Sequence, residues 1–217
     1  MPLALFDLDD TLIDHHAAFL AWAEEFAAAR GLGSQGVSWL LAVKAKYAGP
    51  KDRLFSMVRD EFDLAEPVDL LWRQYRRRIP ELAACCPEDL DALEQLRGAG
   101  WRIGIVTNGM ADNQLAKIHR TGLASLVDTW CVSEEVGIRK PDPRIFRLAA
   151  QQCGMPADRT GWMVGDSLTL DVAGGRAAGL RTVWINPSQR DVPPEQCGPE
   201  LTVAAVAEAV QHLMVAV

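Results

Sequence analysis

Residues 3–12 read LALFDLDDTL, an apolar run that ends abruptly in acidic side chains and a threonine. This pattern predicts a buried central strand whose carboxyl end opens into a site. Because alternate residues of a strand point the same way, Asp7 and Asp9 are expected to converge on one target. Two crowded carboxylates repel each other unless a cation or a shared proton relieves them. We therefore interpret Asp7 and Asp9 as functional residues, and Asp10 as an acidic loop residue.

The composition is typical of a folded chain. Its 217 residues are 49% hydrophobic and 24% charged, enough for one large domain or for one domain with a sizeable insert. The net charge of −7 argues against a general nucleic-acid binder, which needs a positive field. We expect no nucleic-acid polymer as a partner.

The cysteine pattern and the apolar runs indicate a cytoplasmic chain. The five cysteines are odd in number and form no C-x-x-C pair, so neither a disulfide framework nor a zinc site is predicted. The first residues lack a basic segment, and the first apolar run breaks at Asp7, which argues against a signal peptide. No apolar run is long enough to span a bilayer, so no membrane partner is expected.

Residues 14–80 are predicted to form an all-helical block inserted after the first strand, because they contain no strand-like run. Helices are expected over residues 17–27, 37–47, 51–62 and 67–78. Gly31 ends the first helix, the glycine-rich stretch 31–36 is expected to be a flexible connector, and Gly49-Pro50 and Glu66-Pro67 mark further breaks.

From Pro87 the chain alternates between helix and strand. Strands are expected over residues 101–107, 127–132, 161–165 and 182–185. Helices are expected over residues 88–99, 111–121, 143–153, 170–178 and 202–214. This alternation predicts a doubly wound, Rossmann-like parallel sheet with helices on both faces, formed by a core domain of residues 1–13 and 81–217.

Ligands of such sheets bind outside the carboxyl ends of the strands. Thr107-Asn108-Gly109 and Gly165-Asp166-Ser167 both follow predicted strands, so they are expected on the same rim as Asp7 and Asp9. A cluster of carboxylate oxygens without histidine or cysteine suits Mg²⁺ rather than zinc. Asp171 is expected beside the metal or bracing its ligands, although a charge favoured at a helix N-terminus is the alternative explanation.

Anion-binding groups are expected on the same rim. Thr107, Asn108 and the backbone N–H of Gly109 are donors at a strand end, an arrangement that holds an anion well. Lys140 among carboxylates would be paired and could contact an anionic substrate oxygen; alternatively it is a solvated loop lysine. Together these groups suit phosphoryl transfer through an aspartyl-phosphate, with a second carboxylate that protonates the leaving oxygen and then activates water.

Four blocks of sequence, standing in order along nearly the whole chain, resemble the haloacid dehalogenase (HAD) superfamily of hydrolases. The blocks are Asp7-Leu8-Asp9-Asp10-Thr11, Thr107-Asn108, Lys140-Pro141, and Gly165-Asp166-Ser167 with Asp171. The resemblance is to the branch with a helical cap inserted after the first strand. It implies that residues 14–80 are that cap, which closes over the site and selects the substrate.

The resemblance also implies a role for individual residues. Asp7 would be the nucleophile, Asp9 the general acid and base, and Thr107 with Lys140 would contact the phosphoryl group. Mg²⁺ would be held by Asp7, the backbone carbonyl of Asp9, and Asp166. Supporting roles fall to Asp171, Ser167 and Thr11.

Asp9 favours a phosphatase over a dehalogenase. Members of the family that dehalogenate lack an aspartate at this position, and an alkoxide leaving group needs a proton whereas a halide does not. We therefore expect an enzyme that hydrolyses a small phosphomonoester, such as a nucleotide or a sugar phosphate, as a monomer or a homodimer. The alternatives are a phosphotransferase or phosphomutase with the same intermediate, and a non-catalytic phospho-accepting or regulatory protein.

Two further features leave the substrate open. Residues 72–78 read WRQYRRR, which could bind an extended anion but is more readily explained as a solvated helix face. His15 and His16 lie near the nucleophile loop and could touch substrate, although histidines at a hinge are more often simply exposed.

Overall fold

The computed structural model describes residues 1–47, 51–193 and 198–215, without the side chains of residues 51 and 52. The chain divides into two compact units, one formed by Met1–Asp14 with Ala84–Val217 and the other by His15–Ala83. The expected break at Gly49-Pro50 lies outside the described residues. No helix of the described residues is both long and apolar enough to cross a membrane.

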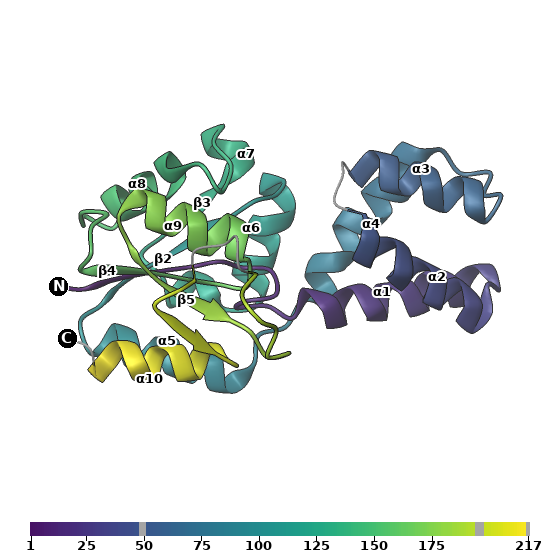
Figure 1. The fold of residues 1–217 in the computed structure, drawn as a ribbon. Helices are drawn as coiled ribbons and strands as arrows, with labels where there is room; N and C mark the ends of the chain where they lie inside the picture. The colour runs from purple at the N-terminus through teal and green to yellow at the C-terminus, as the bar shows by residue number, and fades with distance from the viewer. Residues whose placement is uncertain (48–50, 194–197, 216–217) are drawn as a thin grey trace. The chain divides into compact units, whose positions relative to one another are not determined.

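The first unit is built on a six-stranded parallel sheet (Figure 1). Its strands are β1 (Leu3–Phe6), β2 (Arg102–Thr107), β3 (Thr129–Val132), β4 (Gly161–Gly165), β5 (Arg181–Ile185) and β6 (Leu201–Val203). They run in the order β3-β2-β1-β4-β5-β6. Non-consecutive neighbours such as β1 and β4 require crossovers, which helices provide. The predicted doubly wound sheet is therefore confirmed, with β1 at its centre between β2 and β4.

Helices cover both faces of this sheet. They are α5 (Pro87–Gly98), α6 (Ala111–Arg120), α7 (Ser133–Val136), α8 (Pro143–Gln152), α9 (Ala173–Ala178) and α10 (Val206–Val215), with short turns at η1 (Leu123–Ser125) and η2 (Leu168–Val172). In Figure 1, α5 and α10 lie together on one face and α8 and α9 on the other. Because both faces of β1 are covered, all four of its residues are completely buried, which explains its unbroken apolar sequence.

The second unit is all-helical over its described residues, as predicted. Its helices are α1 (His15–Arg30), α2 (Gly33–Lys46), α3 (Lys51–Glu61) and α4 (Val68–Leu82). Aromatic side chains fill its core. The ring of Trp22 lies 4.9 Å from that of Tyr75 and 5.8 Å from that of Phe55, both edge-to-face, and Phe19 lies 5.3 Å from Trp22. Such rings bury much apolar area in favourable geometry, so this unit has a hydrophobic core of its own.

Two predictions of local structure are wrong. The stretch 31–36 is not a flexible connector throughout, because α2 begins at Gly33 and Gly36 is buried within its first turn. Residues 202–214 do not form one helix: Leu201–Val203 pair with β5 as the edge strand β6, and α10 begins only at Val206. Three residues are too few to show a strand pattern, and the free edge of β5 provides what the local sequence does not.

Candidate active site

The loop after β1 places two carboxylates at the carboxyl end of the sheet. The N–H of Asp7 donates to the carbonyl of Val164 at 2.9 Å, so the backbone pairing with β4 continues one residue past β1. The chain then turns back on itself: Asp10 has a φ of 59°, and its N–H donates to the carbonyl of Ile13 at 2.7 Å. Aspartate tolerates this left-handed conformation better than most residues, which explains its presence at the turn.

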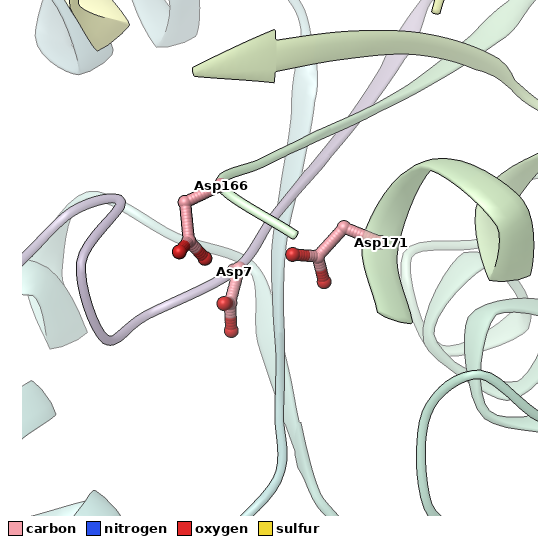
Figure 2. Close-up of side chains that lie close together, drawn as sticks. All are labelled: Asp7, Asp166 and Asp171. Atoms are coloured by element: carbon pink, nitrogen blue, oxygen red, sulfur yellow. The ribbon is translucent and has the colours of Figure 1, made fainter. Parts of the chain in front are cut away.

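Three carboxylates from distant parts of the chain meet at this edge. Asp7 follows β1, Asp166 follows β4, and Asp171 lies in η2; one carboxylate oxygen from each lies within 4.8 Å of the other two. Figure 2 shows the three side chains lying close together. This oxygen-only set is of the kind that binds Mg²⁺, so the residues present fit that ion.

Asp171 is completely buried and is held by the backbone of the preceding turn. Its carboxylate accepts a hydrogen bond from the N–H of Ser167 at 3.0 Å, and the Ser167 hydroxyl accepts one from the N–H of Leu170 at 3.2 Å. A Cβ at Gly165 would collide with the Asp171 carboxyl group, so glycine is needed where β4 passes this side chain. Residues 168–172 form a single π-helical turn, a feature that often occurs at functional sites.

Burial and the neighbouring negative charges raise the pKa values of two of these carboxylates, those of Asp7 and Asp166. Burial raises the pKa of Asp7 well above its ordinary value, and repulsion from Asp171 adds to the effect. Burial, followed by the carboxylates of Asp171 and Asp10, raises the pKa of Asp166 to about 7. Negative charge is therefore costly at this position, and a divalent cation would relieve it.

Lys140 lies within the acidic cluster rather than in solvent. Its ammonium nitrogen is 2.5 Å from a carboxylate oxygen of Asp7 and 2.7 Å from one of Asp171, and the residue is only 4% exposed. Burial by itself would lower the pKa of Lys140, but Asp171 and Asp7 outweigh burial and raise that pKa above its ordinary value. Lys140 is therefore a charged group held next to Asp7.

Asn108 and Gly109 have partners that the sequence did not suggest. The Asn108 amide accepts from the backbone N–H of Lys140 at 2.9 Å and donates to its carbonyl at 3.1 Å, so this side chain positions Lys140 instead of facing an anion. The N–H of Gly109, expected to hold an anion, donates to the hydroxyl of Ser133 at 3.1 Å. Both interactions need residues more than twenty positions away, which no local pattern could reveal.

Asp9 lies apart from the three-carboxylate cluster. Lys117 donates to its two carboxylate oxygens at 2.7 and 3.0 Å, and the side-chain amide of Gln114 donates to one of them at 3.0 Å. The same amide donates to the hydroxyl of Thr107, the last residue of β2, at 2.6 Å. Neither Gln114 nor Lys117 was predicted as a site residue. The pattern that could have indicated them is a pair of polar residues three positions apart, which lie on the same buried face of α6 as Ile118.

Two other features singled out in the sequence are Thr11 and the basic run at residues 72–78. The Thr11 hydroxyl is buried with no hydrogen-bond partner among the described residues. In the basic run, Arg73 pairs with Asp69 at 2.8 Å, and Arg78 pairs with Glu25 at 2.6 Å. Both of these arginines therefore form exposed ion pairs on the surface of the helical unit, which agrees with the interpretation as a solvated helix face.

Several known proteins are similar to this chain in sequence. The chain is 35% identical to phosphoserine phosphatase of Thermus thermophilus, over 96% of this chain and 97% of that protein. It is 39% identical to the pyrimidine 5'-nucleotidase YjjG of Escherichia coli, over 62% of this chain and 59% of that protein. It is 32% identical to glyceraldehyde 3-phosphate phosphatase of Methanopyrus kandleri, over 83% and 82% of the two chains.

A solved structure extends the likeness to the whole fold. The putative HAD-hydrolase YfnB of Bacillus subtilis, whose crystal structure has magnesium bound, superposes with a TM-score of 0.77 at 27% identity, covering 98% of both chains. Residues 1–179 match the family described as haloacid dehalogenase-like hydrolase. This confirms the resemblance drawn from the four sequence blocks: the chain belongs to the haloacid dehalogenase-like hydrolases.

Proposed function

We propose that this protein is a Mg²⁺-dependent phosphatase that hydrolyses a small phosphomonoester through an aspartyl-phosphate on Asp7. The observation that carries the proposal is that two neighbouring carboxylates have different surroundings. Asp7 lies in the acidic cluster against Lys140, whereas Asp9 lies outside that cluster and is held by Lys117. Two carboxylates in different surroundings suit a nucleophile and a separate acid and base.

The proposed metal ligands are the carboxylates of Asp7 and Asp166 and the backbone carbonyl of Asp9. When bound, Mg²⁺ would neutralise the charge that otherwise repels a phosphate from this acidic edge. Asp171 bonds to Lys140 and to the Ser167 N–H, which supports a bracing role for it rather than a direct one.

The chain's own residues would perform the chemistry in two steps. An Asp7 carboxylate oxygen attacks phosphorus, the ester P–O bond breaks, and Asp9 gives a proton to the departing oxygen. Asp9 then takes a proton from a water molecule that attacks the same phosphorus, which releases inorganic phosphate and restores Asp7. The Thr107 hydroxyl and the Lys140 ammonium would hold the phosphoryl oxygens as negative charge redistributes.

The relatives, taken as a group, support the proposed substrate class. These relatives are named for activities on a nucleotide, an amino-acid phosphate and a sugar phosphate, and these substrates share only the phosphomonoester group. We therefore assign this chain a small phosphorylated metabolite, with the helical unit His15–Ala83 acting as the cap that selects it.

A substrate panel tests the proposal. We expect the purified protein to release inorganic phosphate from some of a set of phosphorylated metabolites with Mg²⁺, and to release none with a chelator. Asp7→Asn is the matched inactive control, because its amide is a poor nucleophile of the same shape. Phosphate release that survives either chelation or Asp7→Asn would contradict the proposal, and conversion of one glucose phosphate into another without release would favour phosphoryl transfer to a sugar.

A further inference from the structure

We infer that Lys117 and Gln114, two buried residues of α6, form a positioning pair that fixes the carboxylate of Asp9 and orients the hydroxyl of Thr107 for phosphoryl transfer. The inference rests on the proposed function and adds to it two residues that none of the four sequence blocks contains. The pair couples the acid and base group at the end of β1 to the phosphoryl contact at the end of β2.

Lys117 is buried in a way that only a specific partner explains. It is 2% exposed, and burying an ammonium group is costly unless it is paired and hydrogen-bonded. Its nitrogen reaches both carboxylate oxygens of Asp9, at 2.7 and 3.0 Å, and the Gln114 side-chain oxygen at 2.9 Å. A contact to both oxygens, together with the hydrogen bond from Gln114 to one of them, holds the carboxylate more firmly than a single hydrogen bond would.

Gln114 links two residues that come from different strands. Its side-chain nitrogen donates to the Thr107 hydroxyl at 2.6 Å and to Asp9 at 3.0 Å, and its oxygen accepts from Lys117. This set of partners determines the orientation of the amide, because a reversed amide would place its oxygen against the Asp9 carboxylate. Since the Thr107 oxygen accepts from Gln114, its own O–H is directed elsewhere, as a donor for a phosphoryl oxygen.

The backbone is shaped to admit this pair. A Cβ at Gly109 would lie 2.7 Å from Cγ of Gln114, so the chain has glycine where the side chain passes. The backbone of Gln114 is fixed as well, because its main-chain N–H donates to the carbonyl of Met110 at 3.0 Å, at the start of α6. The first turns of α6 are therefore built around the position of this amide.

A positioning role and a purely structural ion pair predict different kinetics. If the pair only stabilised the fold, its loss would affect all substrates equally. If it positions Asp9, its loss would be greatest where the departing oxygen most needs a proton. p-Nitrophenyl phosphate releases a stable phenolate and depends little on that proton, whereas an alkyl phosphate depends on it strongly. The value of kcat/KM reports this step, because it covers the reaction up to departure of the leaving group.

The test compares Lys117→Met and Gln114→Leu with the wild type on both substrates at saturating Mg²⁺. We expect kcat/KM of Lys117→Met to fall about tenfold or more with glycerol phosphate and less than about threefold with p-nitrophenyl phosphate. Gln114→Leu also loses the hydrogen bond to Thr107, so its kcat/KM should fall with both substrates and further with glycerol phosphate. Arg120→Met is the matched control, since it removes a positive charge from an exposed position of the same helix and should change neither value. Lys117→Arg, which keeps the charge and the donors, should recover part of the loss with the alkyl phosphate.

The outcomes separate this inference from the proposed function. A wild type that releases phosphate from no member of the substrate panel would overturn the proposed function and this inference with it. An active wild type whose variants lose equal factors on both substrates, or lose nothing, would overturn the inference alone. The same conclusion would follow if neither variant folds, as judged by thermal melting, or if a crystal structure of a variant finds the Asp9 carboxylate undisplaced.

Discussion

Asp7 and Asp9 are two positions apart in the sequence, yet the fold gives them different neighbours. Asp7 is 8% exposed and lies among carboxylates, with Lys140 as its nearest cation. Asp9 has a side chain that is 26% exposed, and its cation is Lys117. Separate environments let two like groups take opposite parts in one reaction, which is the basis of the proposed mechanism.

The raised pKa of Asp166 predicts how Mg²⁺ stabilises the protein. Its value of about 7 in the folded chain lies above the ordinary 3.8, so between these pH values the folded state binds more protons than the unfolded state. The contribution of Asp166 to the free energy of unfolding therefore falls as pH rises from about 4 to about 7. Because Mg²⁺ binds the deprotonated carboxylate, we expect it to raise the melting temperature more at pH 8 than at pH 5.

Thermal melts with Mg²⁺ and with a chelator, at both pH values, measure this difference. Asp166→Asn is the control, because it removes one of the two carboxylates with raised pKa values and should weaken the dependence on pH. An equal Mg²⁺-induced shift at pH 5 and pH 8 in the wild type would contradict a metal site that includes Asp166.

At the scale of elements, the junction between β4 and η2 depends on one glycine. Gly165→Ala would drive a methyl group into the Asp171 carboxyl group, which is completely buried and bonded to Lys140. We expect this substitution to lower the free energy of unfolding by about 1–3 kcal/mol, as overpacking of a buried site does, and to reduce phosphatase activity. Denaturant unfolding measures the first effect and phosphate release the second.

Gly98→Ala is the matched comparison, and we expect it to raise the free energy of unfolding. Gly98 lies in α5, and a Cβ there would meet nothing within 4 Å. Alanine at such a site stabilises by about 0.4–1 kcal/mol, mainly by restricting the unfolded chain. If Gly165→Ala were as harmless as Gly98→Ala, the close packing of β4 against Asp171 would not hold.

The sequence predicted those elements whose signals are local. β1 was evident because an unbroken apolar run ends in carboxylates, and the strand ends at Thr107 and Gly165 followed from the alternation of helix and strand. β6 could not be predicted, because its pairing depends on the edge of β5 rather than on its own three residues. The same holds for side chains: the clamp of Asn108 on Lys140 and the contacts of Lys117 with Asp9 join residues brought together only by the folded chain.

At the scale of the whole molecule, a parallel sheet brings the carboxyl ends of its strands to one edge, and the chain uses this to assemble its site. β1, β2 and β4 are neighbours in the sheet, and they supply Asp7, Thr107 and Asp166 although these residues are up to 159 positions apart (166 − 7). The helical unit follows β1 directly, so the loop that carries Asp7 and Asp9 is also the first connection between the two compact units.

The most direct test asks whether phosphorus becomes bonded to Asp7. The protein is mixed with p-nitrophenyl phosphate and Mg²⁺, quenched in acid and digested, and its peptides are weighed by mass spectrometry. We predict a phosphoryl group on Asp7, more of it in Asp9→Asn because hydrolysis of the intermediate is slowed, and none in Asp7→Asn. Phosphate release with no such adduct in either the wild type or Asp9→Asn, together with an active Asp7→Asn, would contradict the account.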